Sequence, residues 1–96
     1  MTRAEALARL ADLRDLTYSD LDAVFGAYGF VTESPNFETE VYYHPQWLRC
    51  GAFTARDDGL HVVTLAQRRL VRGMLECVEF HEAYSGGQQQ GPKRKA

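Results

Sequence analysis

The chain has 96 residues, of which 45% are hydrophobic and 25% charged, a composition typical of one globular domain and not of a disordered chain. Its formal net charge is −2, and without the cations Lys93, Arg94 and Lys95 it has 8 basic against 13 acidic residues, so the body lacks the broad basic surface of most nucleic-acid-binding domains. No apolar run approaches the roughly 18 residues of a membrane helix, and no apolar signal segment follows Met1, so we expect a cytoplasmic protein with no membrane partner.

The two cysteines, Cys50 and Cys77, match no zinc-binding spacing. In a cytoplasmic protein we expect buried thiols in preference to a disulfide. The sequence contains no cofactor motif and no cluster of metal ligands, so we expect neither a metal nor a cofactor.

The first predicted element is an accessory helix over residues 3–13. Thr2 and Glu5 have the spacing of a capping box, and Leu7 and Leu10 follow at helical intervals. The apolar stripe is narrow, so this helix packs either on the edge of its own domain or on a partner.

A second helix is predicted over residues 18–28, with Thr17 as its N-cap. One apolar face contains Leu21, Val24, Phe25 and Tyr28. Gly29 follows at the position where a residue with positive φ commonly ends a helix.

Three strands are then expected, over residues 30–32, 37–44 and 50–55, with a turn at 34–36. In the second strand, alternation places one set of side chains on the core face and the other on the opposite face. The predicted core set is Phe37, Thr39, Val41 and Tyr43, and the opposite set is Glu38, Glu40, Tyr42 and His44. Pro45 ends this strand, and residues 60–63 form either a short fourth strand or the lead into the next helix.

The last helix is predicted over residues 65–83, after a capping box of Thr64 and Gln67. Its apolar stripe is Leu70, Val71, Met74, Leu75 and Val78. Residues 85–96 are rich in Gly and Gln and predict a flexible basic tail. The chain therefore predicts one α+β domain over 1–84, a two-layer sandwich of order α-α-β-β-β-α with two helices on one face of a three-stranded antiparallel sheet.

Three segments between about Thr17 and Val78 have a familiar order: LDAVFGAYGF, EVYYHP and AFTARDDGLHVVTLAQRRLVRGMLECV. Together they resemble the double-stranded-RNA-binding-like fold of the HicA family of toxin–antitoxin toxins. The resemblance implies an endoribonuclease that cleaves messenger RNA and is held inactive by a HicB-like antitoxin.

The HicA motifs that carry activity are replaced in this chain. The family's Gly-Ser-His at the start of the second strand aligns with residues 37–39, so Thr39 replaces the essential histidine. Its Pro-x-His near the end of the third strand aligns with Ala55, Arg56 and Asp57. The resemblance thus implies an RNA-binding domain whose catalysis is impaired.

Proton transfer in RNA cleavage could instead use His44 or His61, because histidine titrates near neutral pH. His44 is the catalytic candidate, although a surface or edge histidine is routine at the end of a strand. His61 could simply pair with Asp57 or Asp58. His81 lies at the predicted end of the last helix, where the helix dipole favours a cation.

Seven residues are predicted to contact nucleic acid through phosphate binding or base stacking. They are Tyr42, His44, Arg49, Arg56, Arg68, Arg69 and Arg72. For the last three arginines the alternative is a solvated helix face, with Arg72 paired to Glu76 at i+4.

Two functions from different classes follow from the sequence. The first is a HicA-type domain that binds RNA or cleaves it. The second is a non-catalytic protein-interaction module that binds an antitoxin-like partner or self-associates as a homodimer, through the open sheet face or the first helix.

Overall fold

The computed structural model describes residues 1–12, 14–36, 39–56 and 62–88. Within these ranges, three helices and three strands follow one another in the predicted order, and a short 3-10 turn lies between the last two strands. The elements are α1 (Arg3–Ala11), α2 (Tyr18–Gly26), β1 (Val31–Asn36), β2 (Thr39–Tyr43), η1 (Leu48–Cys50), β3 (Ala52–Arg56) and α3 (Leu65–Gln88). The predicted α+β class and element order are confirmed.

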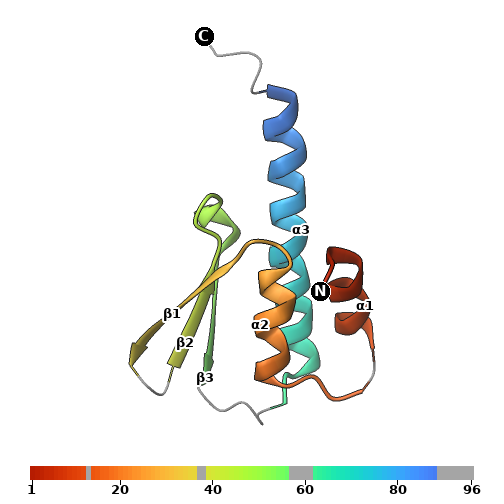
Figure 1. The fold of residues 1–96 in the computed structure, drawn as a ribbon, viewed down its shortest axis with the longest axis vertical. Coiled ribbons are helices and arrows are strands. Elements are labelled where there is room, and N and C mark those ends of the chain that lie inside the picture. Colours follow the sequence, from red (N-terminus) through yellow and green to blue (C-terminus); the bar gives the residue numbers. More distant parts are fainter. Residues whose placement is uncertain (13, 37–38, 57–61, 89–96) are drawn as a thin grey trace.

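The sheet is antiparallel, with strand order β1-β2-β3. Tyr42 in the central strand lies opposite Thr32 on one side and Phe53 on the other. The sheet stands on one side of α2 and α3, and α1 lies on the far side of those helices (Figure 1). One sheet face therefore carries the helices and the other is open.

The first helix packs on its own domain, the first of the two possibilities that its narrow stripe allowed. Ala6 and Leu10 are buried. The Arg3 guanidinium donates two hydrogen bonds to Glu82 of α3, at 2.6 and 2.9 Å, and Arg9 pairs with Asp20 of α2 at 3.2 Å. These contacts tie α1 to both of the other helices.

The predicted faces of the second strand are wrong, because the buried set is the one that contains Tyr42 and His44. Tyr42 is 1% exposed and stacks on Phe25 of α2, with ring centroids 4.7 Å apart. Val41 and Tyr43 are half-buried on the open face. Glu38 and Glu40 suggested that this face is polar. Burying the Tyr42 ring against the helices contributes more to stability than keeping this face in water.

Several boundaries differ from the prediction. Strand β1 includes Pro35, in the segment predicted as a turn; Pro is tolerated here because β1 is an edge strand. Cys50 belongs to η1, and β3 begins only at Ala52. The helices α1 and α2 end earlier than expected, and α3 continues to Gln88, beyond the predicted end at residue 83.

The start signals of the helices are confirmed. Thr64 N donates to Gln67 Oε1 at 2.8 Å and Gln67 N donates to Thr64 Oγ1 at 3.1 Å, and the Thr2–Glu5 box is likewise complete. Gly29 has the predicted positive φ, +86°. In the stripe of α3, Leu70 is 55% exposed and was wrongly placed in the core; the buried members are Val71, Met74, Leu75 and Val78.

The segment before α3 is only partly described. Val62 forms an isolated antiparallel bridge with Thr17, and Val63 N donates to Leu16 O at 2.7 Å. This pairing joins the start of α2 to the lead into α3. Phe37, Glu38 and His61, together with the tail cations, lie outside the described residues.

Candidate functional site

The catalytic candidate His44 is an internal residue, 6% exposed. Its Nδ1 accepts a hydrogen bond from Gln46 N at 3.1 Å, and its ring meets Phe30 edge-on at a centroid distance of 5.4 Å. Its Nε2 faces the backbone of Gly29. At this exposure the imidazole offers little surface to a substrate.

Tyr42 offers no ring face on which a base could stack. Its hydroxyl donates to Asp22 Oδ1 at 2.5 Å and lies 3.1 Å from Glu40 Oε1. Burial, followed by the hydrogen bond to Asp22, raises the pKa of this phenol well above its ordinary value. The hydroxyl thus stays protonated and joins Asp22 and Glu40 in a polar network at the edge of the helix layer.

The described phosphate-binding candidates lie in two places, three arginines on α3 and Arg49 beside η1. The Arg68 guanidinium donates to the backbone carbonyls of Leu10, Asp12 and Arg14, so it serves the segment after α1. Arg72 pairs with Glu76 at 3.3 Å, as the i+4 alternative predicted.

Three of the predicted arginines have exposed side chains, Arg49, Arg69 and Arg72. Arg69 and Arg72 line a hollow near the start of α3 together with Arg68, whereas Arg49 lines a separate hollow beside η1. The side chain of Arg56 lies outside the described part.

The hollow beside Arg49 is lined by three large apolar side chains that are exposed. Leu48 is 67% exposed, Phe80 57% and Tyr84 59%. The rings of Phe80 and Tyr84 stack at a centroid distance of 5.0 Å. We call Leu48, Phe80 and Tyr84 the aromatic surface.

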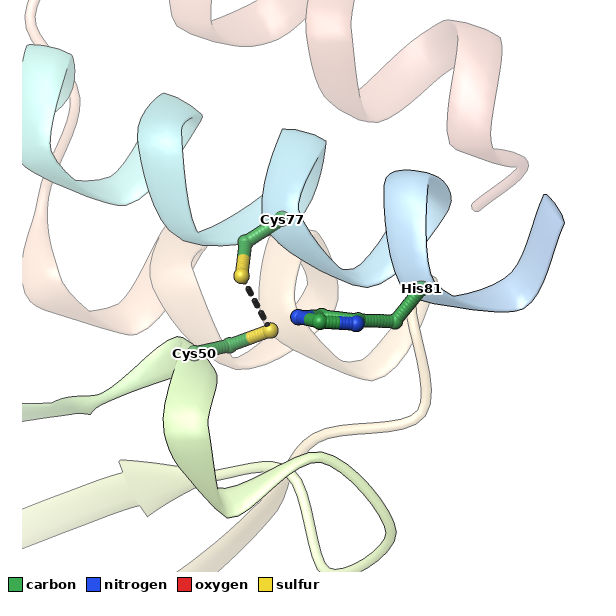
Figure 2. Close-up of side chains that lie close together, drawn as sticks. All are labelled: Cys50, Cys77 and His81. Atoms are coloured by element: carbon green, nitrogen blue, oxygen red, sulfur yellow. Dashed lines mark hydrogen bonds between the residues drawn. The ribbon is translucent and has the colours of Figure 1, made fainter. Parts of the chain in front are cut away.

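Next to the aromatic surface lies a cluster of two thiols and an imidazole, drawn in Figure 2. Cys50 Sγ and Cys77 Sγ are 2.6 Å apart, and both cysteines are free. The donor atoms of Cys50, Cys77 and His81 all lie within 4.8 Å of one another. His81 points its ring toward the two sulfur atoms, one helical turn along α3 from Cys77 (Figure 2).

The environment of the cluster is only partly open. Cys50 is 7% exposed, and Cys77 and His81 are half-buried. Burial, and next the hydrogen bond with Cys77, raises the pKa of the Cys50 thiol to about 12. The His81 ring stacks on Trp47, with centroids 5.5 Å apart and planes 17° from parallel.

Sequence reasoning missed this cluster. The relevant signal is the Cys77-x-x-x-His81 spacing, which places both side chains on one face of a helix. Cys50 is far from them along the chain, and only the packing of η1 beside α3 brings it near. The buried thiols expected from the sequence are found for Cys50, while Cys77 is half-buried.

Comparison of this chain with models of protein families, with curated proteins and with solved structures finds no match. Within the described residues, no helix has both the length and the apolar character required to cross a bilayer.

Proposed function

We propose that this domain is a non-catalytic binding module that docks a protein partner on its aromatic surface. The observation that supports the proposal is the exposure of Leu48, Phe80 and Tyr84 around one hollow. A single exposed apolar residue is ordinary, but a contiguous group on a small domain is typical of an interaction site. Aromatic side chains supply large, rigid contact areas and are enriched in interfaces.

The surroundings of the surface favour a particular partner chemistry. Arg49 and His81 line the same hollow, and Pro45 borders it. A partner that fits would present apolar side chains to the rings and a carboxylate to Arg49. In the HicA resemblance, the corresponding partner would be a HicB-like antitoxin.

Among the described residues, the positions of the catalytic candidate His44 and of the phosphate-binding candidate Arg68 support a binding role over RNA cleavage. His44 is buried, Arg68 is bound to backbone carbonyls, and neither faces the aromatic surface's hollow. General acid–base catalysis requires a titrating group within reach of the reacting atoms.

RNA binding of the HicA type is a second candidate, favoured by one observation. Exposed Arg49 lies in the same hollow as the stacked rings of Phe80 and Tyr84. A cation beside aromatic rings is the combination with which proteins bind single-stranded RNA.

Photo-crosslinking in the cells that naturally produce the protein separates these candidates. A benzophenone amino acid replaces Phe80, and in a matched variant it replaces exposed Ala66 near the other end of α3. The two positions are about 21 Å apart along the helix axis. After irradiation, adducts are identified by mass spectrometry and by nuclease treatment.

A protein adduct specific to position 80 is the expected result, and an adduct between two copies of the chain would identify the partner as a homodimer. A nuclease-sensitive adduct at position 80 would instead favour RNA. Equal labelling from positions 80 and 66 would refute the aromatic surface as a binding site.

A further inference from the structure

We infer that Cys50, Cys77 and His81 form a binding site for one thiophilic metal ion of the Zn²⁺ type, with a fourth coordination position left for water or an external ligand. Two thiolates and an imidazole are ligands that Zn²⁺ prefers. The site borders the aromatic surface through His81, but the inference does not depend on the proposed function.

The distances among the three donor atoms suit such an ion after a small adjustment. All three lie within 4.8 Å of one another, and the two sulfurs are 2.6 Å apart. In a tetrahedral zinc site with Zn–S bonds near 2.3 Å, two sulfur ligands lie about 3.8 Å apart. The sulfurs must therefore separate by about 1 Å, which a modest rotation of one cysteine side chain supplies.

The three ligands come from rigid elements. Cys77 and His81 are separated by four residues within α3, so they project from one helix face. Cys50 is the last residue of η1, where Cys50 N donates to Trp47 O at 2.9 Å. A site whose ligands are fixed before binding loses little conformational entropy when the ion arrives.

His81 distinguishes a metal site from a simple pair of redox-active thiols. A disulfide between Cys50 and Cys77 would need no third group, yet the imidazole is turned toward both sulfurs (Figure 2). Stacking on Trp47 holds the ring in place, as outer groups commonly orient a metal-binding histidine.

Trp47 lies beside the cluster and carries an unpaired donor. Its Nε1 is buried and has no hydrogen-bond partner among the described residues. An unpaired buried N–H costs free energy, so native structures rarely leave one. This indole stacks on His81, so an unpaired polar group adjoins the proposed ligand.

The test is a titration of the full-length, reduced protein with Co²⁺, followed by displacement with Zn²⁺. Tetrahedral Co²⁺ gives intense visible bands, and bound thiolates add ultraviolet charge-transfer bands. We expect one equivalent of Co²⁺ to bind and Zn²⁺ to displace it. A reduced wild-type protein that binds neither ion stoichiometrically would overturn the inference.

Three variants assign the ligands. Cys50→Ser and Cys77→Ser should each lower the charge-transfer intensity by about half, because one thiolate of two is lost. His81→Phe keeps a ring that can stack on Trp47, retains both thiolates, and should weaken binding by roughly 10-fold or more. Unchanged affinity in His81→Phe would refute the three-ligand site.

The redox alternative is measured on the same protein. Thiols are alkylated without added reductant and the peptides are analysed by mass spectrometry. A persistent Cys50–Cys77 disulfide, together with no metal binding after reduction, would replace the inferred site with a redox pair. Circular dichroism of each variant verifies folding, and the wild-type titration stands whether or not a variant folds.

Discussion

The Nε2 atom of His44 lies 3.1 Å from the place where a Cβ atom would stand on Gly29. Gly29 has φ +86°, a conformation that a residue with a side chain adopts only at a cost. The turn after α2 and the end of β2 therefore fit together because residue 29 has no side chain. This contact also holds the His44 imidazole in the interior, where it is 6% exposed.

Gly29→Ala should accordingly destabilise the domain by about 2 kcal/mol or more, since the left-handed backbone alone costs roughly 1–2 kcal/mol. Urea unfolding followed by circular dichroism measures the change. The matched control is Gly73→Ala in α3, where a new Cβ meets nothing within 4 Å. That variant should be more stable by about 0.5–1 kcal/mol, because alanine is the better helix former. A loss of stability in Gly73→Ala as large as that in Gly29→Ala would contradict this account.

Tyr42→Phe tests the polar network at the edge of the core. The variant keeps the stacking on Phe25 but removes the hydroxyl that bonds to Asp22 and Glu40. We expect a loss of about 1 kcal/mol in urea unfolding, typical of one hydrogen bond. Tyr43→Phe, whose hydroxyl bonds to Glu33 on the open face, is the control and should change stability less. Equal losses of stability in Tyr42→Phe and Tyr43→Phe would show that the interior network contributes no more than an exposed hydrogen bond.

Much of the fold could be predicted because its signals are local. A capping box needs only residues three apart, as in Thr64 and Gln67, and the positive φ of Gly29 follows from its place after a helix, although α2 itself ends at Gly26. The apolar stripe of α2 was correct for the same reason, since its four members repeat with the helical period. Leu70 was misplaced because the apolar stripe of α3 is wider than the buried face of that helix, so Leu70 at its margin is exposed.

The face of β2 could not be decided from alternation alone. A period of two divides a strand into two sets without saying which set is buried, and an error of one residue exchanges them all. Glu40 suggested a solvent face, yet it lies on the core side and reaches the Tyr42 hydroxyl at the edge. The site built on Tyr42 and His44 depended on that choice, so it was placed on the wrong side of the sheet.

The thiol–imidazole cluster depends on tertiary packing. Cys50 and Cys77 approach one another only because η1 packs beside α3, and no local pattern encodes that packing. Its one local component, Cys77 and His81 one turn apart, is too common in helices to indicate a site alone.

Glu82→Gln tests how α1 is fastened to α3, and its effect should depend on pH. Hydrogen bonds from Arg3 lower the pKa of the Glu82 carboxyl below its ordinary value. A lowered folded-state pKa contributes stability above the unfolded-state value of about 4.3, and that contribution is lost as the pH falls through the folded-state pKa. Both side chains are 39% exposed, so we expect Glu82→Gln to cost only about 0.5–1 kcal/mol at pH 7.

Urea unfolding of wild type and Glu82→Gln at pH 7 and at a pH where Glu82 is protonated measures the difference. The two proteins should differ at pH 7 and become equally stable in acid. Glu76→Gln is the control, because its pair with Arg72 is more exposed and lies within one helix. If Glu82→Gln remained less stable than wild type by the same free energy of unfolding in acid, the carboxylate charge would not be what holds α1 on α3.

Arg68→Ala tests whether this arginine is structural, as its contacts indicate, or a ligand for phosphate. Its guanidinium donates to the carbonyl of Leu10, in the last turn of α1, and to those of Asp12 and Arg14 in the segment that follows. Removing it should cost about 2 kcal/mol, because several partly buried carbonyls lose a charged donor together. Hydrogen exchange should become faster in α1 and remain unchanged in the sheet. Arg69→Ala, on the same turn but exposed, should leave both stability and exchange near wild type. If the two variants were equally stable and only RNA binding separated them, Arg68 would be a phosphate ligand after all.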